Sequence, residues 1–143
     1  MRQVQRSAIV PYTAEAMFDL VADVESYPQF LPGCTGAAVR SRDGEEVVAS
    51  IALSQGPLKT EFTTRNRLTR PGSIAMMLVD GPFSALSGVW EFTPLGDGGA
   101  RVSLSLEFSF TSQVTDLLLG PPFEALCNGL IEAFVRRARS VHG

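Results

Sequence analysis

The sequence predicts an α+β fold in which a curved antiparallel sheet packs against one long C-terminal helix. Between residues 36 and 110, apolar and polar residues alternate with a period of two, and turn signals divide the region into strands. After residue 112 the apolar residues recur with the period of a helix. Successive strands followed by a helix favour a layered domain with its helices on one face of the sheet.

A strand over residues 2–10 opens the chain, and Pro11 ends it. Thr13 is a good N-cap, and apolar residues at helical spacing predict a helix over 13–23. Two prolines limit residues 24–33 to a single helical turn or a loop. We expect this segment to expose its large apolar residues, which are Tyr27, Phe30 and Leu31.

Six further strands are joined by hairpins. They pass through 37–42, 46–54 and 58–68, and then through the alternating segments 74–78, 86–92 and 102–110. Asp43-Gly44 is a strong hairpin turn. Gly88 lies on an inward face, where a glycine permits a bend or a close approach.

A change of period marks the C-terminal region. Gly120-Pro121-Pro122 is expected to interrupt a short helical stretch at 112–119, and the long helix starts near residue 121 because proline is tolerated in a first turn. Its apolar stripe consists of Phe123, Leu126, Cys127, Leu130, Phe134 and Ala138.

This layout predicts a cavity. One helix is roughly 10 Å wide and cannot fill a broad concave sheet, so either large side chains or a ligand must occupy the space between them. The predicted lining residues are Phe62, Met76, Leu78, Trp90, Phe108, Leu126, Leu130 and Phe134. The predicted entrance consists of Tyr27, Phe30, Leu31, Phe83 and Leu86, on the loops 27–33 and 80–86. The alternative is a core that the side chains fill completely, in which the apolar loop residues only anchor their loops to that core.

Composition excludes several classes of protein. The 143 residues fit a single ligand-binding domain over 1–143, and a formal net charge of −3 argues against a protein that coats nucleic acid. The two cysteines, Cys34 and Cys127, are too few for a disulfide framework and read as reduced, buried thiols. No leader or membrane span is recognisable, so we expect a cytoplasmic protein with at most peripheral contact with the inner membrane.

Catalytic motifs are missing. The only histidine is the penultimate residue, His142, which leaves no histidine for a catalytic triad or a zinc site. No phosphate-binding glycine loop occurs. We therefore predict no enzyme activity, no catalytic residue, no metal and no catalytic cofactor. A buried general acid remains the alternative; its candidates are Asp19, Asp23, Asp80 and Glu91.

Two groups of basic residues are candidates for surface contacts. Lys59, Arg65 and Arg67 share an outward strand face that Glu61 interrupts, and Arg136, Arg137 and Arg139 lie near the end of the last helix. Cations are favourable at that end of a helix dipole. The alternative role is contact with RNA or anionic lipid.

Four motifs resemble one family over almost the whole chain. They are Val24-Glu25-Ser26-Tyr27-Pro28-Gln29-Phe30-Leu31-Pro32, Asp80-Gly81-Pro82-Phe83 continuing to Leu86, Gly88-x-Trp90-x-Phe92, and Phe134-x-x-Arg137-Ala138. In this order and spacing the chain resembles the coenzyme Q-binding START-domain family, within the polyketide cyclase/START-like superfamily. This family includes mitochondrial ubiquinone-binding proteins and bacterial RatA proteins. The resemblance implies a helix-grip fold: a seven-stranded sheet around a C-terminal helix, with two short helices after strand one and an apolar tunnel.

The resemblance also implies two functions of different classes. The first is binding of ubiquinone or a related isoprenoid lipid by a carrier or chaperone that supports respiration; the quinone would be a bound ligand and not a catalytic cofactor. The second, by similarity to RatA, is binding of the large ribosomal subunit by a toxin that blocks subunit association. The apolar inward face favours the lipid, and surface charge is the basis for the ribosome.

Overall fold

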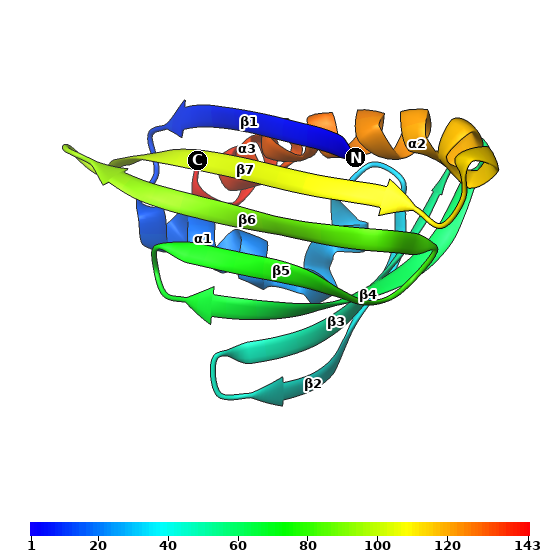
Figure 1. Ribbon diagram of the computed structural model, residues 1–143. Helices are drawn as coiled ribbons and strands as arrows, with labels where there is room; N and C mark the ends of the chain where they lie inside the picture. Colours follow the sequence, from blue (N-terminus) through cyan, green and yellow to red (C-terminus); the bar gives the residue numbers. More distant parts are fainter.

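The computed structural model describes residues 1–143 and has the expected α+β architecture (Figure 1). Its strands are β1 (Arg2–Val10), β2 (Cys34–Asp43), β3 (Glu46–Gln55), β4 (Leu58–Thr69), β5 (Ser73–Asp80), β6 (Phe83–Leu95) and β7 (Gly99–Phe110). Its helical segments are α1 (Ala14–Ala22), the 3₁₀ helix η1 (Val24–Gln29), α2 (Gln113–Asn128) and α3 (Leu130–His142). The two short helices after strand one are present as α1 and η1.

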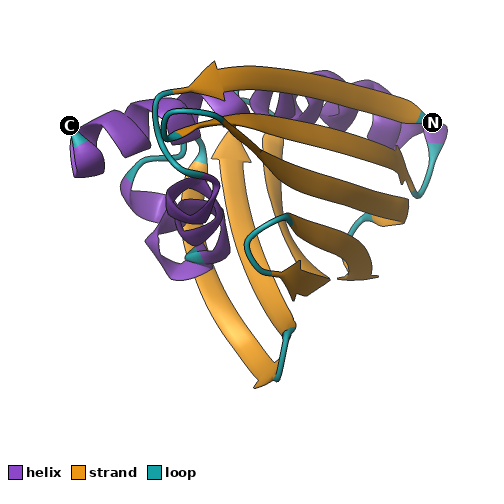
Figure 2. Cartoon of the chain, turned by 90° about the vertical axis from the view of Figure 1, so that its left-hand side faces the viewer, coloured by secondary structure: helices purple, strands orange, loops and turns teal.

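All seven strands form one antiparallel sheet in the order β1-β7-β6-β5-β4-β3-β2. The strands follow the chain except that β1 pairs with β7, with Val4 opposite Leu106. The sheet bends strongly between its two edges, and the helices lie on its concave side (Figure 2). Because the sheet wraps around these helices, their apolar faces meet inside the bend.

Alternation along the strands is confirmed by burial. The inward residues of β7 are all buried and are Val102, Leu104, Leu106, Phe108 and Phe110. The predicted stripe of the C-terminal region is buried or half-buried throughout and faces this surface. The core therefore lies between the concave sheet and the helices, as the periodicities indicated.

Gly88 makes the close approach that its inward position predicted. A Cβ atom at Gly88 would collide with Leu106 and would lie 3.0 Å from the backbone oxygen of Ser105. Any larger residue would force the Leu106 side chain to move and would crowd the Ser105 carbonyl oxygen. The hairpin turn between β2 and β3 is one residue later than expected, since Asp43 pairs with Glu46 and Gly44 adopts a φ of +60°.

The C-terminal helix does not begin near residue 121, so that prediction of its start is wrong. Ser112 caps α2, whose first residue is Gln113, and α2 passes through Pro121 and Pro122. Each proline removes one N–H donor, and the carbonyls that lose a donor four residues earlier belong to exposed Leu117 and Leu118, where water can replace it. The helical path is instead interrupted at Gly129, between α2 and α3.

Two predicted apolar loops are also corrected. Tyr27 and Leu31 are buried and Phe30 is half-buried, because the aromatic rings of this segment pack on Phe134 of α3. In the second segment β6 already starts at Phe83, which is buried together with Leu86. Neither segment exposes the apolar surface that was expected of it.

Candidate functional site

A cavity of about 110 Å³ lies between the concave face of the sheet and the C-terminal helices. Of the 20 residues that line it, 16 are hydrophobic, so the cavity suits an apolar occupant. One water needs roughly 10–15 Å³ on the same measure. The free space therefore greatly exceeds the small packing defects of an ordinary core, and the side chains do not fill the interior.

Most of the residues predicted as lining reach the cavity. Phe62, Met76, Trp90, Leu126, Leu130 and Phe134 line it. Leu78 and Phe108 do not. Phe108 is fully buried elsewhere in the core, with its ring centroid 4.8 Å from that of Phe123 and 6.3 Å from that of Phe83. Alternation identified the inward face but not the position along the strand where the space lies.

The predicted entrance residues divide into two groups. Tyr27, Leu31 and Leu86 belong to the cavity wall itself, while Phe30 and Phe83 do not line it. The Tyr27 hydroxyl donates a hydrogen bond to the Val21 carbonyl, which fixes this ring inside. Whether any of these residues contacts a ligand stays a prediction.

Several lining residues were not predicted. They are Val24, Pro32, Cys34, Ile51, Leu53, Thr64, Asn66, Gly88, Leu106, Phe123 and Cys127. Most are apolar residues that the pattern could not separate from ordinary core. Thr64 and Asn66 carried a signal, because they are polar residues on the inward face of β4.

One cation holds η1 against α3. Arg137 donates from Nη2 to Gln29 Oε1 at 2.9 Å, and its Cζ lies 5.0 Å from the centroid of the Phe30 ring. Phe30 in turn packs edge-on against Phe134, with 5.2 Å between centroids. We call these four residues the Arg137 latch. The latch keeps the segment that carries Tyr27 and Leu31 over the cavity.

The titratable groups of the cavity wall are neutral at pH 7. Burial raises the pKa of Tyr27 above its ordinary value, and burial raises the pKa of Cys127 to about 12. Burial likewise raises the pKa of Cys34. Both cysteines are unpaired and buried, as predicted. An unionised thiol is a poor nucleophile, so these groups serve as wall rather than as reagents.

Nowhere do three or more His, Cys, Asp or Glu side chains gather as a protein metal site would require. None of the helices is both long and apolar enough to cross a bilayer.

Comparison with known proteins identifies the family. The family model described as polyketide cyclase/dehydrase and lipid transport matches residues 10–135. The chain belongs to this family. Within it, the chain is 48% identical over 143 residues to "Ribosome association toxin RatA" of Vibrio cholerae, covering 100% of this chain and 99% of the relative. It is 26% identical over 146 residues to "Coenzyme Q-binding protein COQ10, mitochondrial" of Drosophila melanogaster, covering 99% of this chain and 60% of that protein.

Solved structures agree with the family assignment. A START superfamily protein from Mycobacterium smegmatis superposes with a TM-score of 0.80 at 20% identity, over 97% of this chain and 98% of that chain. At this identity the likeness shows the fold alone. The resemblance inferred from the sequence motifs is confirmed by these findings, and so is the fold that it implied.

Proposed function

We propose that this protein binds an apolar small molecule of the isoprenoid quinone class in the cavity and carries it shielded from water. The observation that supports the proposal is a cavity of about 110 Å³ with a largely hydrophobic wall. Transfer of hydrocarbon from water into such a space contributes roughly 0.8 kcal/mol for each CH₂ group. Each isoprene unit, with its five carbons, therefore contributes roughly 4 kcal/mol before the costs of association.

The size of the cavity limits what it holds. At roughly 10–15 Å³ for each water, 110 Å³ corresponds to about seven to eleven waters. This is room for about a head group with one isoprene unit, and not for a long polyisoprenoid tail. A long-chain ligand would need the cavity to widen or its tail to leave past the Arg137 latch.

We further propose that the ligand is held and not transformed. The raised pKa values of Tyr27, Cys34 and Cys127 keep these groups protonated at pH 7, so the wall offers no charged nucleophile or base. A binding role agrees with the lipid transport part of the family description. Product formation from a bound polyketide or quinone by the purified protein would contradict this reading.

Ligand binding is tested with Trp90, the single tryptophan, which lies in the cavity wall. A short-chain quinone is expected to quench its fluorescence with a micromolar Kd. Leu126→Phe fills part of the cavity and is expected to weaken binding at least tenfold. Leu117→Phe is the matched control, because Leu117 lies on the same helix and is 73% exposed.

A parallel measurement looks for the natural ligand. Organic extraction of the purified protein followed by mass spectrometry is expected to release a quinone or another isoprenoid. A clean extract together with an unchanged Trp90 spectrum would contradict the proposed ligand.

Association with the ribosome is the second candidate function, and sequence similarity favours it. The relative named for ribosome association is 48% identical over the whole chain, against 26% for the relative named for coenzyme Q binding. Such an association would use the outer surface, where Lys59, Arg65 and Arg67 are exposed. We propose that the protein acts in the cytoplasm, with at most peripheral contact with the inner membrane; its similarity to bacterial proteins named for ribosome association supports this location.

Co-sedimentation with isolated large ribosomal subunits tests this second function. We expect the protein to pellet with the subunits at low salt and to pellet less as salt rises, because contacts with phosphates release counterions. Small subunits serve as the control. Equal recovery in the supernatant with and without large subunits would contradict the ribosomal role.

A further inference from the structure

We propose that Thr64 and Asn66 form a polar subsite in the cavity that binds a hydrogen-bond acceptor, such as a quinone carbonyl oxygen, of an otherwise apolar ligand. This inference rests on the proposed ligand-binding function and adds the chemical group that the cavity selects. Both residues line the cavity, on the inward face of β4. They are 5% and 8% exposed, so each is more than nine-tenths buried.

The internal hydrogen bond of the pair determines which groups stay free. Thr64 donates from Oγ1 to Asn66 Oδ1 at 2.8 Å. This bond uses one of the two lone pairs of the Asn66 amide oxygen. Asn66 Nδ2 donates no hydrogen bond to any protein atom. Every side-chain nitrogen or oxygen that is fully shielded from solvent has a hydrogen-bond partner. The Nδ2 group must therefore border free space.

The free space that Nδ2 borders is apolar. Asn66 lines the main cavity and a smaller hollow next to it under α1, and nine of the ten residues around the smaller hollow are hydrophobic. An amide donor in such surroundings gains from an acceptor, because leaving it unbonded away from water costs free energy. The two N–H groups of Nδ2 can only donate, so they select an oxygen that accepts.

A purely structural role explains the pair less well. The hydrogen bond between the two residues satisfies neither N–H group of the Asn66 amide, which has no protein partner, so mutual pairing does not by itself account for a buried asparagine here. Apolar side chains fill the neighbouring inward positions of β4 at Phe62 and Leu68. Thr64 and Asn66 are thus the two polar residues of β4 that line the cavity, between apolar Phe62 and Leu68.

The test compares two ligands that share one carbon skeleton. One is a quinone with a single isoprene unit, and the other is the corresponding hydrocarbon without oxygen atoms. Asn66→Leu, which keeps the approximate side-chain shape, is expected to weaken quinone binding about fivefold to tenfold, the loss of one hydrogen bond. Affinity for the hydrocarbon is expected to change less than twofold.

The ratio of the two affinities is the decisive quantity, because a partly unfolded sample lowers both affinities by the same factor. Asn66→Ser is a second variant, in which the shorter side chain no longer places the Nδ2 donor at the cavity. Thr60→Val is the matched control, since Thr60 lies on the same face of β4 but outside the cavity wall. It is expected to leave the ratio unchanged.

Each outcome has one meaning. A lower quinone-to-hydrocarbon ratio in both Asn66 variants supports the subsite. An unchanged ratio in either variant, including an equal loss for both ligands, overturns the subsite but leaves the proposed function standing. If the wild-type protein binds neither ligand, the proposed function fails and the subsite fails with it.

Discussion

Arg2 connects β1 to α2, whose residue Asp116 lies 114 positions along the chain. Its guanidinium donates to both carboxylate oxygens of Asp116, at 2.9 and 3.0 Å, and approaches Glu124 at 3.4 Å. Gly120 makes room for this contact, because a Cβ atom there would lie 2.5 Å from Arg2 Nε. The Gly-Pro-Pro sequence predicts an interruption of the helix, but its glycine instead leaves the space that the Arg2 side chain occupies beside α2.

The Arg2–Asp116 pair makes stability depend on pH. The hydrogen bond from Arg2 lowers the pKa of the Asp116 carboxyl below its ordinary value. The folded pKa is depressed, so the pair stabilises the fold above the ordinary aspartate pKa of about 3.9 and loses this effect as pH falls through the folded pKa. We expect Asp116→Asn to be less stable than wild type at pH 7, with a difference that shrinks toward zero in acid.

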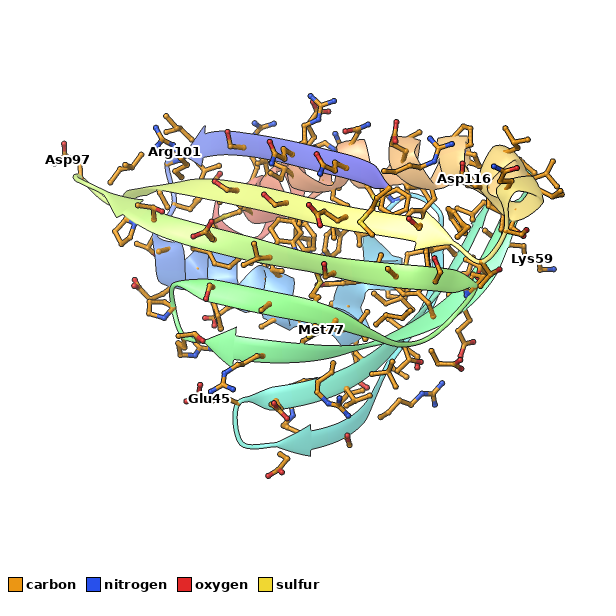
Figure 3. The ribbon with its side chains drawn as sticks, in the orientation of Figure 1. Glu45, Lys59, Met77, Asp97, Arg101 and Asp116 are labelled. Carbon is orange, nitrogen blue, oxygen red and sulfur yellow. The ribbon has the colours of Figure 1, made fainter.

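Urea unfolding at several pH values from 7 downward measures this difference. Asp97→Asn is the control, because Asp97 is exposed in a turn at the other end of the molecule and forms no ion pair (Figure 3). A stability difference for Asp116→Asn that does not vary with pH would contradict the role of the ion pair.

The short helix η1 contributes Val24 and Tyr27 to the cavity wall and is joined to α3 by the Arg137 latch. Its sequence predicts that prolines keep it short, and this is confirmed. Its inward orientation depends on partners more than 100 residues away, namely Phe134 for the rings of Tyr27 and Phe30 and Arg137 for Gln29. No local pattern contains these contacts, so the sequence could not show that Tyr27 and Leu31 are part of the wall.

Loosening the Arg137 latch is expected to change binding kinetics more than affinity. Arg137→Ala removes the hydrogen bond to Gln29 and the cation–π contact with Phe30, which is worth roughly 0.5–1 kcal/mol at such sites. We expect association and dissociation of a short-chain quinone to accelerate severalfold, with Kd changing less than about threefold. Stopped-flow Trp90 fluorescence gives both rates.

Arg136→Ala is the matched control for the latch, because Arg136 is the neighbouring arginine and is exposed. Its rates should equal those of wild type. If Arg137→Ala also keeps wild-type rates, η1 is not the element that ligands must displace.

The two proposed functions use different parts of the molecule. The cavity lies on the concave side of the sheet, whereas Arg65 and Arg67 of β4 are exposed. Arg65 pairs with Met77 of β5, which is exposed and is labelled in Figure 3. The outer face also carries Glu46 opposite Arg67 and an ion pair between Arg40 and Glu61, so its positive charge is partly balanced. This arrangement makes the functions separable by substitution.

We expect Arg65→Glu combined with Arg67→Glu to reduce co-sedimentation with large ribosomal subunits by at least fivefold and to leave the quinone Kd unchanged. Leu126→Phe should instead weaken quinone binding and leave co-sedimentation unchanged, because the side chain at this position lies in the cavity wall. Fluorescence titration and sedimentation of the same preparations measure both properties. Loss of ribosome association in Leu126→Phe would show instead that the interior controls the surface.

The sequence by itself determined the order of the elements, the inward face of each strand and the apolar stripe of the last helices. These follow from the periods of strand and helix, which are local properties of the chain. It also determined the family, because four motifs retain their order and spacing. From these faces it identified Phe62, Met76 and Trp90 as cavity residues.

Only the tertiary structure decided where the free space lies along those faces. Phe108 lies on an inward face and fills its part of the core, while Asn66 lies on another and borders the cavity. The passage of α2 through Pro121 and Pro122 and the break at Gly129 were decided in the same way. The physical reason is that a cavity is the space left over when side chains from distant elements pack together. No single stretch of sequence specifies where that space remains.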